Sequence, residues 1–191
     1  MSKKILQKEE KVLRRVAKEV PLSEIQTTKI KKILREMSES LKSQSDGVAI
    51  AAPQIGYSLR IFVVSGKVMQ IGFPTQNVSQ ADEQKVSEGS DPTKNDPAEA
   101  NVADLIFINP KISKLSREKN WVPEGCLSVR PYYGKTFRST KATATAYDET
   151  GKKFTRGASG LLAQIFQHET DHLNGILFID HAKDIKAEVQ K

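Results

Sequence analysis

Two histidines and a glutamate near the C-terminal end of the sequence have the spacing of a metal site. His168 and His172 are four positions apart, and Glu169 follows the first of them. On an α-helix such residues share a face, roughly 40° apart. Two imidazoles placed in this way can bind a divalent metal ion, and the adjacent carboxylate can take a proton from water on that ion. The alternative is a chance match on a surface helix, because only three positions of the pattern are fixed.

The residues around this motif predict a buried helix from about 160 to 173. Ser159 is placed to cap its start, and Asn174 and Gly175 are typical of a helix end. Buried helices rarely carry several histidines and acids unless these have partners. The metal site is therefore favoured over the surface helix. Apolar residues surround the motif: Leu161, Leu162, Ala163, Ile165, Phe166 and Leu173.

The third ligand is expected upstream of the motif. Gly175 fits the glycine of the extended zinc-protease pattern, but Phe178 occupies the position of its third histidine. Another class of protease uses a glutamate about twenty residues downstream of its motif, and this sequence ends at Lys191 before such a residue occurs.

Cys126 is the candidate for that ligand. It is the only cysteine of the chain, so it cannot form an internal disulfide. Gly125 before it allows the backbone to turn, which can place the sulfur and the Leu127 N–H at one cavity. A thiolate and two imidazoles make a three-ligand site with one position left for water, which indicates catalysis rather than a structural role. A buried, inert thiol is the alternative.

Length and composition indicate one domain. The chain has 191 residues, of which 38% are hydrophobic, enough for a single core. No apolar run approaches the ~20 residues that a membrane span needs, and the start shows no signal peptide. We therefore expect a cytoplasmic protein without membrane attachment. The sequence leaves the oligomeric state open, with a monomer favoured.

The net charge of +7 is unevenly distributed. Residues 79–104 hold seven acids and two lysines, a net charge of −5, so the rest carries +12. A basic body favours approach to polyanions, but the sequence shows no aromatic interleaving and no recognition motif. A solvated surface is the simpler interpretation, and no specific nucleic-acid recognition is predicted. The same region is predicted to be a polar insertion, about 66–104, with a long irregular loop over 79–101.

Hydrophobic periodicity predicts the remaining elements. A short basic helix is expected within 5–20, and an amphipathic helix over 23–43 with a capping box at Ser23. Strands are expected at 60–64 and at 105–110, the latter extended or paired by 111–116, and a strand–turn–strand unit at 136–154. A last strand at 176–179 and a frayed basic helix from His181 complete the prediction.

Three stretches together resemble the signatures of peptide deformylases, which remove the N-terminal formyl group from new bacterial and organellar polypeptides. Residues 47–54 fit G-x-G-x-A-A-x-Q except at Ala49, residues 124–128 fit E-G-C-L-S, and residues 167–172 fit Q-H-E-x-D-H, in the family's order. Matches near both ends extend the resemblance over most of the chain. With the elements above, it predicts one catalytic domain over 1–191, an α+β fold in which antiparallel sheets pack around the buried C-terminal helix that carries the motif.

The resemblance implies a role for each motif residue. Cys126, His168 and His172 would bind the metal, usually Fe(II) in this family, with Zn, Ni or Co able to replace it. Glu169 would be the general base and then the acid, so that water activated by the metal attacks the formyl carbon and formate is released. The Gln54 side-chain amide and the Leu127 N–H would form the oxyanion hole.

The resemblance also implies a substrate site for formyl-methionyl nascent chains. The backbone at Val48 and Ala49 would pair with the substrate as an added strand. Substrate contacts are further expected from Glu124, Leu161, Gln164 and Ile165. Transient association with the ribosome through the basic tail is also expected.

This sequence departs from the family at two substrate positions. Ala49 replaces the second glycine of the first motif, which is harmless if its torsions are ordinary. Gln164 stands where the family usually has an aliphatic residue of the methionine pocket. A buried amide needs a local partner or weakens binding of an apolar side chain, so a shifted or broadened side-chain preference is predicted.

Three further residues are expected to support the metal site. Glu124 and Asp171 are expected to orient ligands, and Arg138 to pair with Glu124; ordinary structural salt bridges are the alternative. His181 is expected at the surface.

Two other functions remain open from the sequence. An amidase or peptidase for another acyl group would keep the metal and Glu169, and a metal-binding protein without turnover would not need Glu169 and Gln54.

Overall fold

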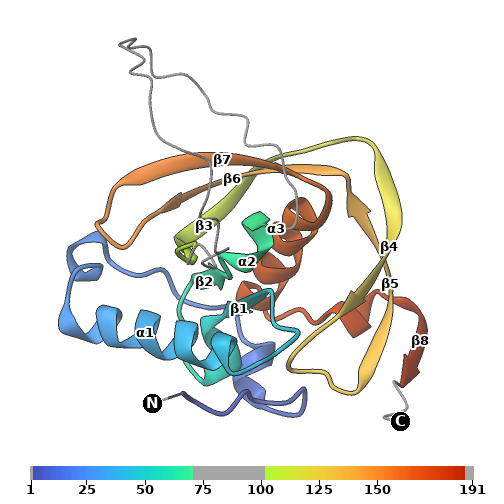
Figure 1. Ribbon diagram of the computed structural model, residues 1–191, viewed down its shortest axis with the longest axis horizontal. Coiled ribbons are helices and arrows are strands. Elements are labelled where there is room, and N and C mark those ends of the chain that lie inside the picture. Colours follow the sequence, from blue (N-terminus) through green and yellow to red (C-terminus); the bar gives the residue numbers. More distant parts are fainter. Residues whose placement is uncertain (1, 71–101, 188–191) are drawn as a thin grey trace, which may run out of the picture.

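The computed structural model describes residues 2–70 and 102–187 of the chain. Two antiparallel sheets, one of five strands and one of three, lie around the helix α3 (Gly160–Leu173), which contains His168 and His172. Figure 1 shows α3 between the two sheets. The predicted α+β class, with antiparallel sheets around a buried C-terminal helix, is confirmed.

The larger sheet has the strand order β1-β2-β3-β6-β7. Its strands are β1 (Ala49–Ala51), β2 (Ile61–Val64), β3 (Leu105–Leu115), β6 (Lys141–Tyr147) and β7 (Lys153–Ser159). The hairpin β6–β7 confirms the predicted strand–turn–strand unit, and β2 and β3 confirm the other two predicted strands. Phe62 and Phe107 stack at 4.5 Å between ring centroids in the core that this sheet forms with α3. Order in the sheet places β1 at an edge.

The smaller sheet has the order β4-β5-β8, with β4 (Lys119–Gly125), β5 (Tyr132–Ser139) and β8 (Lys183–Ala187). Burial alternates along β5, where Thr136 and Arg138 are buried while Lys135 and Phe137 are exposed. Successive side chains of a strand point to opposite faces, so one face of this sheet turns toward α3 and the other toward solvent.

The helix α3 has the predicted bounds. Ser159 occupies the N-cap position, but its side chain makes no capping hydrogen bond. After the C-cap residue Asn174, Gly175 has φ +75°, the left-handed conformation that ends many helices. A Cβ atom at Gly175 would lie 2.8 Å from the carbonyl carbon of Arg14, so the close approach of the N-terminal segment also requires glycine.

The amphipathic helix predicted over 23–43 begins later than expected. Leu22–Glu24 forms a 3-10 turn, and α1 runs from Thr28 to Lys42. Thr27 is the actual cap, because its hydroxyl accepts a hydrogen bond from the Ile30 N–H. The predicted capping box at Ser23 is therefore wrong, while the apolar stripe is buried as expected: Ile30, Ile33, Leu34, Met37 and Leu41.

The predicted helix within 5–20 is also wrong. Only Lys11–Arg14 forms a 3-10 turn, and Leu13 is buried while Val16 is 69% exposed. Backbone groups of this segment bond to distant residues: the Ala17 N–H donates to Leu173 O, and the Lys18 N–H donates to Ser58 O. Pairing with other elements has replaced local helical bonds.

Two predictions at the C-terminal end are corrected. The expected strand at 176–179 is instead a 3-10 turn, Phe178–Asp180, and the expected frayed helix is the strand β8. β8 pairs with β5 in the register Tyr132↔Ala187 and Tyr133↔Lys186. The open edge of β5 therefore determined the conformation of this polar segment, which had no strong pattern of its own.

Part of the predicted insertion belongs to the described chain. Lys67–Gln70 forms the short helix α2, and Val68 is fully buried. The predicted loop at 79–101 lies outside the described residues. No helix in the described ranges is long and apolar enough to cross a membrane.

Candidate active site

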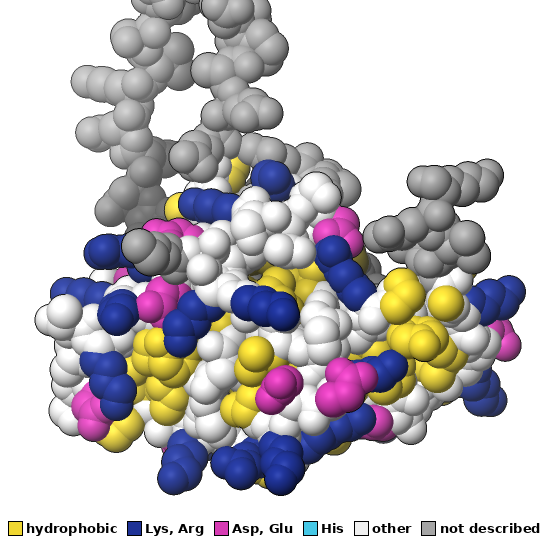
Figure 2. All heavy atoms as spheres, turned by 90° about the horizontal axis from the view of Figure 1, so that it is seen from below, with side chains coloured by type: hydrophobic (Ala, Val, Ile, Leu, Met, Phe, Trp, Pro, Cys, Tyr) yellow, Lys and Arg dark blue, Asp and Glu magenta, His cyan; other side chains and the backbone are white. Residues whose placement is uncertain are grey.

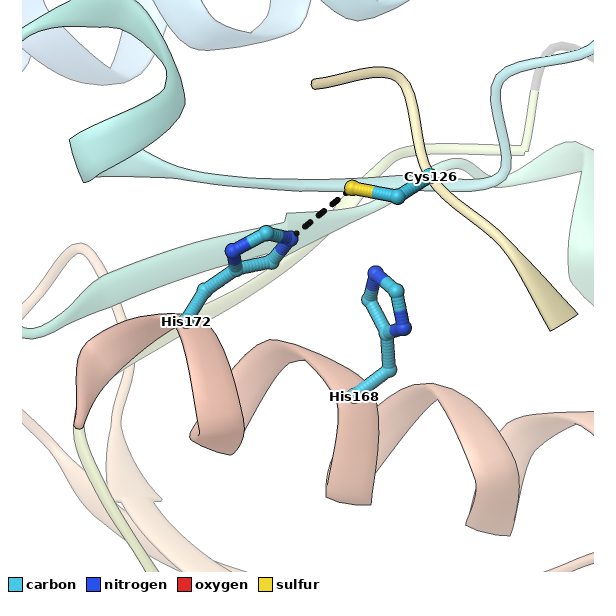
Figure 3. Close-up of side chains that lie close together, drawn as sticks. All are labelled: Cys126, His168 and His172. Carbon is cyan, nitrogen blue, oxygen red and sulfur yellow. Dashed lines mark hydrogen bonds between the residues drawn. The ribbon is translucent and has the colours of Figure 1, made fainter. Parts of the chain in front are cut away.

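Cys126, His168 and His172 come together at the centre of the molecule. One ligand atom from each residue lies within 4.8 Å of the others. Figure 3 shows the two imidazoles side by side on α3, with the sulfur approaching from the loop after β4; the Cys126 Sγ to His172 Nε2 distance is 3.2 Å. The fold thus brings the sulfur close to two ring nitrogens that come more than forty positions later in the sequence.

The chemistry of these three donors fits a divalent transition metal. Thiolate and imidazole suit Fe(II), Zn and related ions, and three protein ligands leave a position for water or substrate. His168 Nδ1 is 2.7 Å from Glu124 Oε1, which leaves Nε2 of that ring for the metal. Burial lowers the pKa of His172 well below its usual value, so this ring is neutral, the form that ligation requires.

Glu124 holds the first histidine in place. Arg138 donates to both of its oxygens, from Nη2 to Oε1 at 2.7 Å and from Nε to Oε2 at 3.0 Å. Thr136 Oγ1 donates to Oε2 at 2.7 Å. Burial alone would raise the pKa of Glu124, but the hydrogen bonds from His168 and Arg138 outweigh it and hold that pKa well below its usual range. Glu124 is therefore a buried carboxylate that remains charged.

Glu169 lies beside the three ligands at the wall of the same cavity. It is 3% exposed, and its Oε2 has no hydrogen-bond partner among the described residues. Burial raises the pKa of Glu169 to about 7, although the nearby His168 imidazole acts in the opposite direction. A carboxyl group with a pKa near neutrality can both accept and return a proton under physiological conditions.

The Gln54 side chain points its amide nitrogen at the Cys126 thiol. Nε2 lies 3.1 Å from Ser128 Oγ and 3.6 Å from Cys126 Sγ, and Oε1 accepts from the Ala51 N–H at 2.8 Å. These bonds fix which end of the amide faces the cavity. Leu127 lines the same cavity directly after Cys126.

A cavity of about 380 Å³ adjoins these groups. Its walls come from the β1 region, the β4–β5 connection and one face of α3. The sequence-predicted substrate residues all line it: Val48, Ala49, Glu124, Leu161, Gln164 and Ile165. His172 is 1% exposed and lies behind this surface.

The edge strand β1 borders the cavity with unpaired backbone. β1 pairs only with β2, in the register Ala49↔Val64, and the Ser65 N–H donates to Val48 O. Hydrogen-bonded positions alternate along an antiparallel strand, so the N–H and C=O of Ala49 point to the open edge. Among the described non-glycine residues only Asn109 and Asp184 have positive φ. Ala49 therefore adopts ordinary torsions, and the missing glycine costs no strain.

The amide nitrogen of Gln164 donates hydrogen bonds to two nearby acceptors. Nε2 donates to Pro123 O at 2.8 Å and to Glu124 Oε2 at 3.2 Å. No hydrogen bond from the described residues reaches Oε1. The side chain thus ties α3 to β4 at the cavity wall.

Asp171 and Arg138 lie one step further from the ligands. Asp171 Oδ2 accepts from Arg138 Nη1 at 2.7 Å, and it is 3.9 Å from Nε2 of the exposed His181. Among the described residues Asp171 makes no hydrogen bond to His168 or His172, so Arg138 links it to Glu124. Its negative charge is one of the effects that raise the pKa of Glu169.

Sequence reasoning missed Thr136 and Ser128. Thr136 shares the inward face of β5 with Arg138, two positions along the strand, and period-two alternation was the signal that could have found it. Ser128 receives the Gln54 amide, a contact across 74 positions that no local pattern encodes.

A sequence model of the family described as Polypeptide deformylase matches residues 2–188. The chain belongs to this family. Deformylases are metal-dependent hydrolases that remove N-formyl groups from nascent peptides, and the clustered thiol and imidazoles form a metal-binding group of the kind that such an enzyme needs.

Curated deformylases from several organisms resemble the chain along most of its length. Peptide deformylase of Dehalococcoides mccartyi is 34% identical over 179 residues, covering 94% of this chain and 85% of the relative. Peptide deformylase 2 of Clostridium acetobutylicum is 35% identical over 172 residues, covering 90% and 89%. Peptide deformylase 1A of tomato chloroplasts is 32% identical over 169 residues, which span 88% of this chain and 55% of the longer plant protein.

Solved deformylase structures share the fold. The Legionella pneumophila enzyme superposes with a TM-score of 0.72 at 29% identity, covering 96% of this chain and 88% of that one. A class I type b deformylase of Acinetobacter baumannii with bound Met-Ala-Ser gives 0.72 at 27% identity, covering 95% and 99%.

Proposed function

We propose that the chain hydrolyses the N-terminal formyl group of formyl-methionyl nascent polypeptides and releases formate. The observation that carries the proposal is the meeting of Cys126, His168 and His172 at a cavity that Glu169 also lines. Purified, metal-loaded protein is expected to release formate from formyl-Met-Ala-Ser. Absence of release by protein with a full complement of metal would refute the proposal.

Cys126, His168 and His172 would hold the metal, which supplies Lewis acidity and makes water nucleophilic at neutral pH when bound. Glu169 is placed to take the proton of the attacking water. Its raised pKa then allows it to deliver that proton to the departing amine. One carboxyl group thereby serves as base and as acid.

Gln54 and Leu127 would stabilise the negative charge that develops on the formyl oxygen. The Gln54 amide is held by Ala51 and Ser128, so its N–H groups are oriented before substrate arrives. Preorganised donors of this kind cost no rearrangement when charge forms. The Leu127 N–H is proposed as the second donor, from the backbone of the same cavity wall.

The substrate backbone would extend the larger sheet at β1. Ala49 offers its N–H and C=O to an added strand, and Val48 is 36% exposed beside it. Leu161 and Ile165 would contact the methionine side chain, with Gln164 at the same wall. This arrangement recognises the peptide backbone and one side chain.

Fe(II) is proposed as the physiological metal, with Zn, Ni or Co able to replace it, because a thiolate with two imidazoles accepts all of these ions. Metal analysis after purification without oxygen tests the assignment. If zinc is bound stoichiometrically under those conditions, the proposal of iron is wrong.

An amidase or peptidase acting on another acyl group would use the same ligands and Glu169. Comparing formyl-Met-Ala-Ser with acetyl-Met-Ala-Ser separates the two, because only the formyl group lacks a methyl substituent on its carbonyl carbon. Faster hydrolysis of the acetyl peptide would favour the alternative. The monomeric state, the cytoplasmic location and the ribosome association stay predictions.

A further inference from the structure

The solvent side of the three-stranded sheet carries aromatic and basic side chains that the proposed reaction does not use. We define the outer face as five residues that point away from α3: Lys119, Trp121, Lys135, Phe137 and Lys183. They come from all three strands of this sheet. In Figure 2 hydrophobic side chains gather next to Lys and Arg at the end of the molecule that this sheet forms.

Trp121 and Phe137 form an exposed aromatic pair. They are direct cross-strand partners, with ring centroids 5.2 Å apart and ring planes inclined by 36°. Trp121 is 45% exposed and Phe137 49% exposed. Two large rings that stay this exposed contribute little of the free energy that burying them would give. The stability of a monomer therefore does not explain why both are present here.

Lysines surround this pair. Lys183 Nζ lies 4.7 Å from the Trp121 ring centroid, and Lys119 Nζ lies 5.9 Å from that of Phe137. Neither lysine makes a salt bridge with the described residues. Lys135 pairs with Asp184 at 3.3 Å, and no other acid in the described ranges lies within salt-bridge distance of these three lysines. The outer face is therefore basic as well as aromatic.

We propose that the outer face binds single-stranded RNA without sequence preference. Unpaired bases stack on exposed aromatic rings, and lysines around the rings neutralise the phosphates. A single strand of RNA uses both components of the surface, because its bases stack on the rings and its phosphates contact the lysines. A purely acidic chain such as polyglutamate would contact the lysines alone. The proposal also gives the predicted ribosome association a physical basis.

The sequence alone did not reveal this surface, because its aromatic and basic residues are dispersed. Pairing of β4 with β5 brings Trp121 and Phe137 together across sixteen positions, and β8 adds Lys183 from the far C-terminal region. Aromatic and basic residues do not alternate along the sequence, but the fold places them next to each other on this surface.

The outer face and the proposed catalytic groups lie on opposite sides of the same sheet. Glu124 and Arg138 project from β4 and β5 toward α3, whereas the outer face projects to solvent. RNA bound there would not enter the cavity. Binding of RNA can consequently be tested without disturbing hydrolysis of a short peptide.

Trp121 is the only tryptophan of the chain, so its fluorescence reports directly on this surface. Titration of the metal-loaded protein with oligouridylate is expected to quench the emission in a saturable manner. Each neutralised phosphate of a single strand contributes about −0.7 to the slope of log K against log salt, so three lysines predict a slope of roughly −2. Phe137→Ala is expected to weaken binding roughly 5- to 100-fold through lost stacking.

A matched pair of double variants separates this surface from general charge. Lys119→Ala with Lys183→Ala is expected to weaken RNA binding and to flatten the salt dependence. Lys31→Ala with Lys32→Ala, on the exposed face of α1, removes the same charge and is expected to leave binding within about twofold. All variants should release formate from formyl-Met-Ala-Ser at the unmodified rate, which also shows that they are folded.

Three outcomes would overturn the proposal. The first is that oligouridylate does not quench the Trp121 emission at low salt. The second is that the α1 double variant loses as much RNA binding as the variant of Lys119 and Lys183. The third is that polyglutamate or anionic lipid vesicles quench the emission as strongly as oligouridylate or more strongly. The last result would assign the surface to an acidic protein or to a membrane. Because formate release is measured separately, failure of RNA binding leaves the proposed hydrolysis unaffected.

Discussion

The amide nitrogen of Gln164 lies 3.2 Å from Oε2 of Glu124, the carboxylate whose other oxygen contacts His168. A residue of the substrate cavity is thereby connected through one carboxylate to a proposed metal ligand. The bond also satisfies an amide that would otherwise be costly at an apolar wall.

Gln164→Met is expected to raise selectivity for formyl-Met over formyl-Gln peptides by roughly tenfold, because it replaces a polar side chain beside Leu161 and Ile165 in the cavity wall by an apolar one. The measurement is kcat/KM for formyl peptides with Met, Leu or Gln in first position. Gln44→Met, at a half-buried position that does not line the cavity, is the control. Strong Met selectivity in the unmodified chain, unchanged in the variant, would contradict a role for Gln164 in side-chain preference.

Glu124→Gln is expected to lower metal affinity roughly 10- to 100-fold, because His168 loses a charged partner that fixes its orientation. Competition with a chelator of known affinity measures this. Asp171→Asn is the matched comparison, since it changes a carboxylate that accepts a hydrogen bond from Arg138 but makes none with His168 or His172 among the described residues. Equal losses in the two variants would show that Glu124 has no special role in holding His168.

Gln54→Leu is expected to reduce kcat by about 10²–10³ with a much smaller change in metal content, because it removes a donor to the developing negative charge. Gln54 also accepts from the Ala51 N–H, so circular dichroism must show that the variant is folded. A kcat within a few fold of the unmodified value in folded, metal-loaded protein would exclude Gln54 from the oxyanion hole.

The pH dependence of stability in metal-free protein should report on Glu169. Burial raises the pKa of this carboxyl from 4.5 to about 7, so the folded state holds its proton more tightly than the unfolded chain does. The corresponding stabilisation is complete below about pH 4.5 and is lost as the pH rises through 7. Urea midpoints between pH 5 and 8 should therefore fall more steeply than in Glu169→Gln, which has no proton to lose. Parallel curves would show that the pKa of Glu169 is not raised.

The elements that position the ligands were predictable because their patterns are local. The apolar run of α3 and its Gly175 end fixed the helix bounds, and three short motifs identified the family. The alternation of β6 and β7 was equally visible. Residues close in sequence specified each of these features.

The segments that failed prediction take their conformation from distant partners. β8 is a strand because it completes the edge of β5. The 5–20 segment forms no helix beyond the 3-10 turn at Lys11–Arg14, because Ala17 and Lys18 bond to residues far along the chain. The position of Asp171 beside Arg138, instead of beside a ligand, likewise depends on how β5 packs on α3. Such contacts carry no signature in a single sequence.

The shortness of β1 has a consequence for selection among substrates. A strand of three residues can form hydrogen bonds with only a few residues of a bound peptide. It is too short for a strand of a second folded protein to pair with it and extend the sheet. An enzyme with such an edge would act on unstructured N-termini and would tolerate almost any sequence after the first few residues. It would not act on folded proteins whose N-terminal residues are buried.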